Sequence, residues 1–141
     1  MIQFTVIGIP QPQGSARAFV PKGWNRAVIT GANSKNKPWR QEVSGMADNA
    51  MQNMSIVGKP KPVLVKCDFF FDRPKSQKKV LHKTTKPDLD KLLRSVLDAM
   101  TGIVFEDDSQ VVACEITKGF GQPARVEITV RWPGPGFDDL L

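Results

Sequence analysis

The run from Val63 to Phe71 constrains the fold more than any other stretch of this 141-residue chain. Alternate positions would face one side of a β-strand, and they are Val63, Val65, Cys67, Phe69 and Phe71. Leu64 and Phe70 make the other side partly apolar as well. A strand that is apolar on both sides belongs in the interior of a sheet or at an interface. We therefore expect an interior strand here, or a strand that takes part in an interface.

Shorter runs with alternating apolar residues predict further strands at residues 2–6, 111–117 and 126–132, and residues 27–30 add a short one. Residues 119–123 read Gly-Phe-Gly-Gln-Pro, a turn-forming sequence. We therefore expect the last two long strands to form a terminal β-hairpin.

Two stretches carry apolar residues at helical spacing. The first begins at Pro38, a residue suited to the first helical position. The second runs from Leu89 to Met100, and Gly102 suits its C-terminal cap. Together the patterns predict an α+β fold: a single domain over residues 1–141, with a small mixed β-sheet of about four strands and two main helices. Residues 133–141 are expected to be a loosely held tail.

The chain carries 20 basic and 14 acidic residues, a net charge of +6, and its pI is about 9.6. This balance favours a polyanionic partner, with nucleic acid ahead of membrane because no cationic amphipathic helix is evident. No apolar run approaches membrane length, and no secretory signal pattern opens the sequence. Cys67 and Cys114 are expected to be buried thiols of a reducing cytosol. The single histidine, His82, excludes a histidine-rich metal site.

Acidic residues stand on both sides of the second helix, with Asp88 and Asp90 at its start and Asp107 and Asp108 after its end. The two pairs would meet if residues 103–105 returned antiparallel along the helix. Clustered carboxylates repel unless a cation neutralises them, and Mg²⁺ prefers such oxygen ligands. This pattern predicts a metal-dependent phosphodiester site. The same residues also fit ordinary helix capping and turn formation, which remains the alternative.

Two loops carry positive charge. The loop over residues 72–86 leads directly into Asp88, and its basic residues are Arg73, Lys75, Lys78, Lys79, Lys83 and Lys86. Residues 8–23 form a Pro/Gly-rich loop with Arg17 and Lys22, where Gly14 and Ser15 would let backbone amides approach a phosphate. Both segments are typical of phosphate-binding loops, and also of solvated loops with scattered charge.

Two motifs together resemble the signature of the RusA family of Holliday junction resolvases, endonucleases associated with phages and prophages. They are Lys-Pro-Asp-Leu-Asp-Lys-Leu-Leu-Arg-Ser-Val-Leu-Asp-Ala-Met at residues 86–100 and Phe-Glu-Asp-Asp-Ser-Gln-Val-Val at residues 105–112. The resemblance extends to Pro-Gln-Pro-Gln-Gly-Ser-Ala-Arg at residues 10–17 and covers most of the chain. It implies a RusA-like homodimer that resolves four-way DNA junctions by paired, symmetric nicks. The nicks would depend on Mg²⁺, with Mn²⁺ as a substitute, and serve DNA recombination and repair in the bacterial cytoplasm.

The resemblance also implies roles for single residues. Asp88, Asp90 and Asp108 would bind the metal, with Asp107 as a further candidate. The family has a functional lysine where this chain carries Arg94, so a role in charge stabilisation is retained while proton transfer is not expected. The alternative for Arg94 is a ladder of ion pairs with Asp90 and Asp98. The expected DNA-binding residues are Gln13, Gly14, Ser15, Arg17, Lys78, Lys79, Lys83, Lys86 and Lys91, the last standing where the family often has asparagine.

Two other functions fit the sequence. One is a metal-dependent nuclease for flaps or linear duplex, because Asp88 with Glu115 and Lys118 faintly resembles the acid and lysine sets of restriction enzymes. The other is a non-catalytic DNA-binding protein whose acidic residues serve only as caps.

Overall fold

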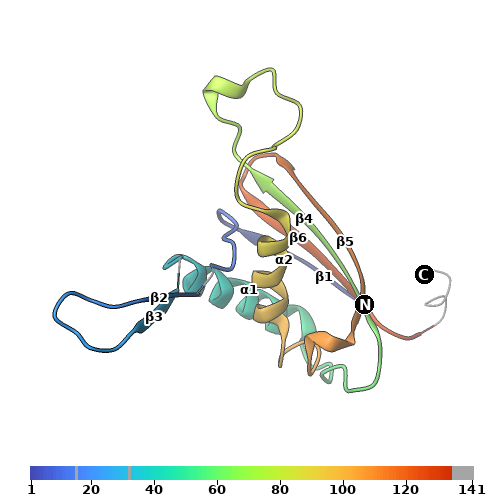
Figure 1. Cartoon of the computed structure of the whole chain (residues 1–141). Coiled ribbons are helices and arrows are strands. Elements are labelled where there is room, and N and C mark those ends of the chain that lie inside the picture. Colours follow the sequence, from blue (N-terminus) through green and yellow to red (C-terminus); the bar gives the residue numbers. More distant parts are fainter. Residues whose placement is uncertain (15, 32, 135–141) are drawn as a thin grey trace.

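The computed structural model describes residues 1–14, 16–31 and 33–134 (Figure 1). A four-stranded mixed sheet forms the centre of the molecule, with the strand order β1-β6-β4-β5. Its strands are β1 (Ile2–Ile7), β4 (Val63–Phe71), β5 (Val111–Phe120) and β6 (Arg125–Arg131). With two main helices on the sheet, the α+β prediction is confirmed. Most of the predicted tail lies outside the described residues.

β4 is an interior strand, as its sequence predicts. It pairs in parallel with β5 on one side and antiparallel with β6 on the other. Each of its five alternate apolar residues is at most 7% exposed. On the opposite face Phe70 is half-buried, and the Arg125 guanidinium lies 4.1 Å from the centre of its ring.

The predicted terminal hairpin is wrong, because β4 lies between β5 and β6. The connection between these two strands passes over the end of β4, where the Gly121 N–H donates to the Phe71 carbonyl at 3.0 Å. A Cβ atom at Gly121 would lie 2.8 Å from Cδ1 of Phe70, so this crossing requires glycine. Pairing with β4 on both sides buries the most apolar strand of the chain, which a hairpin beside it would not do.

The helices α1 (Asn36–Met51) and α2 (Leu89–Met100) pack on one face of the sheet. α2 has the predicted limits, and Gly102 after it has a positive φ of +85°. α1 begins at Asn36 rather than at Pro38, which is tolerated because proline lacks only an N–H that the first turn leaves unpaired anyway. In the described part of the chain, no helix is long and apolar enough to cross a membrane.

Residues 16–19 were expected within a loop, and they form a strand instead. β2 (Ala16–Phe19) pairs antiparallel with β3 (Val28–Gly31), which confirms the short strand expected near residues 27–30. This hairpin projects away from the sheet and helices (Figure 1). The strand was missed because four residues between prolines and glycines give too short a pattern to read.

Residues 103–105 do not run back along α2 as an antiparallel segment. They form tight turns, in which the Val104 N–H donates to the Met100 carbonyl at 2.9 Å and the Gly102 N–H to the Phe105 carbonyl at 2.8 Å. Val104 and Phe105 are fully buried. The apolar side chains therefore turn into the core, and the chain reaches the short 3-10 helix η2 (Asp108–Gln110) directly.

Candidate active site at the start of α2

Asp88 is the N-cap of α2, with extended backbone angles (φ −68°, ψ 139°). Its carbonyl accepts the Leu92 N–H at 3.1 Å, yet its carboxylate makes no capping hydrogen bond. Asp90 follows in the first helical turn. The structure thus places Asp88 before the helix and Asp90 in it, and leaves the Asp88 carboxylate available to solvent or ligand.

Arg94 joins α2 to η2. Its Nη1 atom lies 3.3 Å from Oδ2 of Asp108, the first residue of η2. Within the described ranges, Arg94 forms no ion pair with Asp90 or Asp98, so the predicted ladder is absent. The contact brings an acidic residue from beyond the helix to its first two turns, although residues 103–105 take a different path from the expected one.

Lys91 lies beside the other acid, with its Nζ atom 3.8 Å from Oδ2 of Asp88. The four side chains of this pair and of the Arg94–Asp108 pair each have between one-third and three-fifths of their surface exposed. Exposed ion pairs contribute little to stability and are screened by salt. Their cations can therefore be redirected toward a bound anion at small cost.

Asp107 has the contacts of a capping residue. Its Oδ1 atom accepts the Ser109 N–H at 3.2 Å, and its own N–H donates to Oε1 of Gln110 at 3.0 Å. The Lys59 ammonium lies 3.1 Å from Oδ2 of Asp107. Hydrogen bonds from Lys59 and from the Ser109 backbone, with a smaller contribution from Asp108, lower the pKa of Asp107 to about 2. Asp107 thereby fixes the turn that presents Asp108.

The N-terminal loop borders α2. The Gln13 N–H donates to the Lys91 carbonyl at 2.9 Å, and Nδ2 of Asn36 donates to the Pro12 carbonyl at 3.1 Å and to Oγ of Ser95 at 2.7 Å. These contacts shape an open pocket of about 360 Å³, lined by Gln13, Gly14, Asp90, Lys91, Leu93, Arg94 and Leu97. Four predicted site residues outside the acidic pairs thus meet at one place: Gln13, Gly14, Lys91 and Arg94. Ser15 and the side chain of Arg17 lie outside the described part of the structure.

Lys118 on β5 supports the segment that enters α2. Its Nζ atom donates hydrogen bonds of 2.8 Å to the carbonyl oxygens of Thr85 and Pro87. Sequence reasoning noted Lys118 only through a weak likeness to restriction enzymes. Lys118 pairs with the buried Phe69, so it lies on the face of β5 that turns toward the apolar core. A lysine at such a position was the one local signal of a special role.

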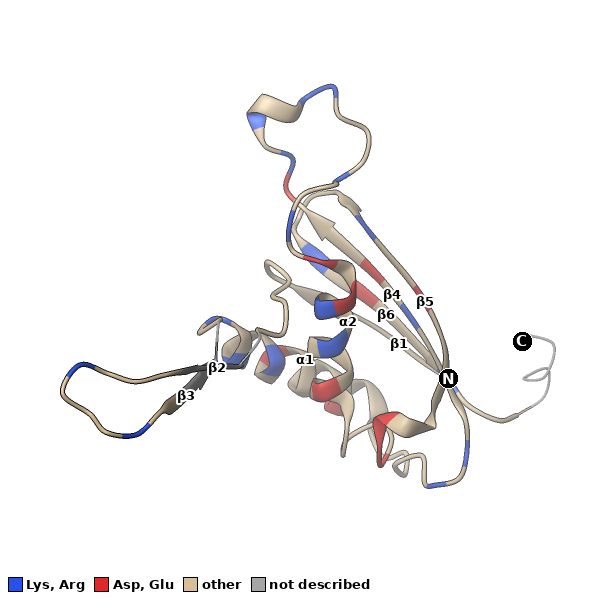
Figure 2. Cartoon of the chain, viewed as in Figure 1, with Lys and Arg blue, Asp and Glu red and all other residues tan. Residues whose placement is uncertain are grey.

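The basic loop over residues 72–86 projects beyond the end of β4 and carries much of the positive charge seen in Figure 2. Two of its cations hold the loop itself: the Arg73 guanidinium lies 4.3 Å from the centre of the Phe120 ring, and the Lys83 ammonium lies 4.8 Å from that of Phe71. Partial burial, with Lys118 nearby, lowers the pKa of Lys83. The remaining predicted DNA-binding residues of the loop, Lys78, Lys79 and Lys86, are exposed.

The acidic residues do not form a closed metal cage. Among residues 1–14, 16–31 and 33–134, no three His, Cys, Asp or Glu side chains gather closely enough to hold a metal ion by themselves. The carboxylates of Asp88, Asp90 and Asp108 are nevertheless the hard oxygen donors that Mg²⁺ uses. Mg²⁺ typically takes one or two protein carboxylates and completes its shell with water and substrate phosphate. The donor set therefore fits a magnesium ion that binds together with a phosphate.

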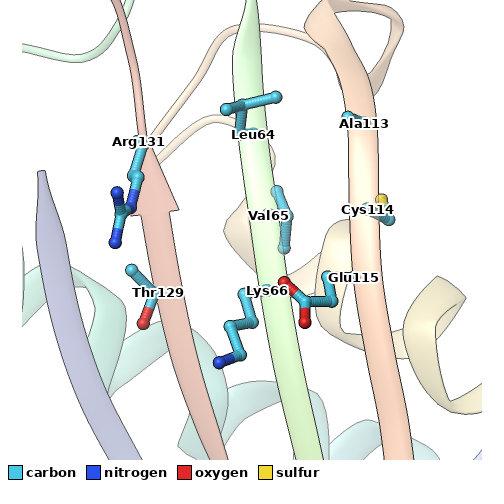
Figure 3. A pocket seen from close by; sticks show the side chains of 8 residues that line it. All are labelled: Leu64, Val65, Lys66, Ala113, Cys114, Glu115, Thr129 and Arg131. Atoms are coloured by element: carbon cyan, nitrogen blue, oxygen red, sulfur yellow. The ribbon is translucent and has the colours of Figure 1, made fainter. Parts of the chain in front are cut away.

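A second hollow, of about 300 Å³, lies on the face of the sheet opposite the helices (Figure 3). Its charged lining residues are Lys66, Glu115 and Arg131. Glu115 thus belongs to the face away from the acids of α2, because its strand partner Lys66 lies on that face. The restriction-type set of Asp88, Glu115 and Lys118 is therefore divided between the two faces of the sheet.

Known proteins resemble this chain over most of its length. The family model described as endodeoxyribonuclease RusA matches residues 10–131, a range that includes the N-terminal loop, both acidic pairs and the whole sheet except β1. The protein YqaN of Bacillus subtilis strain 168, whose name calls it uncharacterized, is 32% identical over an alignment of 141 positions, and this alignment spans 92% of this chain and 95% of that protein. A protein of Lactococcus phage r1t, named crossover junction endodeoxyribonuclease rusA, is 27% identical over 124 residues, or 87% of this chain and 83% of the phage protein.

Proposed function

The chain belongs to the RusA family of endodeoxyribonucleases, and from this premise we propose that it is a magnesium-dependent nuclease that resolves four-way DNA junctions. The phage relative named as a crossover junction endodeoxyribonuclease supports this substrate. The observation that carries the proposal is the contact between Arg94 and Asp108, which joins the two acidic elements at the start of α2.

The metal would bind among Asp88, Asp90 and Asp108, with one or two of these carboxylates and the phosphate of the substrate as its ligands. Bound Mg²⁺, or Mn²⁺ in its place, would supply an activated water and stabilise the charge on the leaving 3′-oxygen. The capping contact of Asp107 fixes the turn that contains Asp108. The hydrogen bond from Lys118 to the Pro87 carbonyl fixes the segment that leads into Asp88. The three acids would thus be oriented from two elements, α2 and η2, before substrate arrives.

Arg94 has a different role from that of a proton donor. A guanidinium stays charged at neutral pH, so it stabilises negative charge on the phosphate without exchanging a proton. In the free protein it faces the Asp108 carboxylate at 3.3 Å. A bound phosphate would attract Arg94 and free Asp108 to act as a ligand.

DNA would lie across the start of α2. The pocket beside Gln13, Gly14, Asp90 and Lys91 would receive the backbone near the scissile phosphate, while Lys78, Lys79, Lys83 and Lys86 would contact the strand that leads to it. Ser15 and Arg17 would extend the contact on the side of the N-terminal loop. Such contacts are independent of sequence and lose strength steeply with salt.

Junction resolution requires two cuts at symmetric positions. A twofold homodimer with one site per chain would deliver both, and we propose this assembly. The expected setting is recombination and repair of DNA in the cytoplasm of a bacterium, from a phage or prophage gene.

The proposal is tested with an end-labelled four-way junction and a linear duplex of matched sequence, each with and without Mg²⁺. Paired symmetric nicks on the junction, and loss of cutting in Asp88→Asn with binding retained, are expected. Asp98→Asn is the matched control, because it makes the same change on the same helix outside the acidic pairs. Cutting of both substrates would instead indicate a general nuclease, and undiminished cutting by Asp88→Asn would refute the assigned metal site.

A further inference from the structure

The tip of the β2–β3 hairpin exposes large apolar side chains. Trp24 is 53% exposed, Val20 60% and Phe19 47%. The turn there is ordered by a hydrogen bond of 3.0 Å from the Trp24 N–H to the Pro21 carbonyl, and Gly23 supplies a positive φ of +84°. A defined turn therefore presents an indole ring to solvent at the end of a projecting arm (Figure 1).

The surroundings of this ring are cationic. Lys22 and Arg26 are exposed beside it, and the Arg26 guanidinium lies 5.9 Å from the centre of the Trp24 ring. The sequence contains no Asp or Glu before Glu42. An aromatic ring between basic side chains suits a nucleic acid, because the bases stack on the ring while the cations meet the phosphates.

The base of the hairpin is fixed to the candidate site. Before β2, the Gln13 N–H donates to the Lys91 carbonyl on α2. After β3, Nδ2 of Asn33 donates to Oε1 of Gln11 and to the Pro12 carbonyl, each at 3.2 Å. Both ends of the arm thus stand beside the pocket that contains Asp90. At about 3.3 Å per strand residue, the tip reaches roughly 20 Å from this anchor.

We propose that Trp24 reads the branch point of the DNA by stacking on a base that the junction exposes. Inside a linear duplex every base face is already stacked on its neighbours, so the ring gains nothing there. At a branch, helices end or change partners, and a base face becomes available. Trp24 would therefore determine the preference for branched over linear DNA. The inference rests on the proposed function and adds to it the residue that sets structural selectivity.

The experiment measures the affinity of Trp24→Ala for a junction and for a matched duplex, without Mg²⁺ so that no cutting occurs. We expect junction affinity to fall about tenfold, since a base that stacks on an aromatic ring contributes substantially to binding. Duplex affinity should stay within twofold. Trp24→Phe should restore most of the loss, and 2-aminopurine at the branch point should respond to the wild-type protein and not to Trp24→Ala. Leu81→Ala, which removes an apolar side chain that is 76% exposed on the other projecting loop, is the control.

Equal losses on junction and duplex would overturn the inference, as would unchanged binding to both. Tighter association of the wild type with vesicles of anionic phospholipid than with the junction, if lost in Trp24→Ala, would assign the tip to a membrane surface instead. Failure of this inference differs from failure of the proposed function: in the first case the wild type still nicks junctions and Asp88→Asn does not.

Discussion

The ammonium group of Lys118 lies 2.8 Å from the carbonyl oxygen of Pro87, one residue before the N-cap Asp88. Its second hydrogen bond, to Thr85, ties the same segment to β5 at a second point. A strand of the sheet thereby sets where the first acidic residue stands.

Replacing Lys118 with methionine should therefore impair cutting more than binding. Methionine keeps much of the apolar stem and removes both hydrogen bonds, so Asp88 loses its support. Misplacement of a reacting group by about 1 Å can reduce a rate by about 100-fold, and we expect a loss of 10- to 100-fold in the single-turnover rate on a junction. Lys66→Met, on the opposite face of the sheet, is the control. A loss of junction affinity that accounts for the whole change would contradict the positioning role.

We expect Arg94 to contribute to cleavage through its positive charge and not through proton transfer. Arg94→Lys retains the charge, and its cleavage rate should stay within about fivefold of the wild type. Arg94→Ala should lower the rate by about 100-fold or more, as removal of a group that stabilises developing charge typically does. Rates at several pH values separate the two roles. If Arg94→Lys introduced a new ionisation into the pH profile, a lysine at this position would act by exchanging a proton.

The depressed pKa of Asp107 predicts how stability changes with pH. The group titrates near 2 in the folded protein and near 3.8 when unperturbed, so its ionised form stabilises the fold above about pH 4. This contribution is lost as the pH falls through 2. Asp107→Asn keeps the capping oxygen and removes the charge, so its melting temperature should be lower than that of the wild type at neutral pH.

Melting curves between pH 2 and 7 follow this difference, which should shrink below pH 4 and nearly vanish at pH 2. High salt should also reduce it, because the Lys59–Asp107 pair is about half exposed. A difference that persists unchanged at pH 2 would show that the asparagine disturbs the turn and not the charge.

The exposed lysines of the loop over residues 72–86 should make DNA affinity depend more steeply on salt concentration. Replacing Lys78 and Lys79 with alanine removes two phosphate contacts, so the slope of log affinity against log salt should fall by about 1.8 on duplex arms. Lys37→Ala, on the exposed side of α1, serves as the control. An unchanged slope in the double variant would remove this loop from the DNA interface.

Local sequence patterns predicted where each helix and strand lies better than they predicted which strands pair with one another. The apolar stripe of α2 set its limits correctly because a helix is defined by its own spacing. Alternation in β5 and β6 predicted two strands correctly, yet it contains nothing about which strand pairs with which. Only the apolar character of both faces of β4 hinted that it would be placed between them. Residues 103–105 were misplaced because burial of Val104 and Phe105 in the core outweighed extension along α2.

In the candidate site, too, local patterns were informative and contacts between distant segments were not predicted. The acidic residues were proposed as site residues from their spacing and from the family motif. The groups that position them could not, since Lys118, Asn36 and Ser95 act through contacts between segments more than 30 residues apart. A lysine on a strand, an asparagine at the first position of a helix and a serine within a helix have no distinguishing local pattern. Their roles follow only once the sheet has brought the segments together.

The order of strands also governs when this protein can become active during its synthesis. Every pairing in the four-stranded sheet joins segments that are far apart in the sequence: β1 pairs with β6, and β4 pairs with both β5 and β6. Contacts of such separation form slowly. A nascent chain can close the small β2–β3 hairpin early, but it cannot complete the sheet that supports α2 until residue 131 has left the ribosome. An unfinished chain would therefore carry the acidic residues of the site without the framework that aligns them.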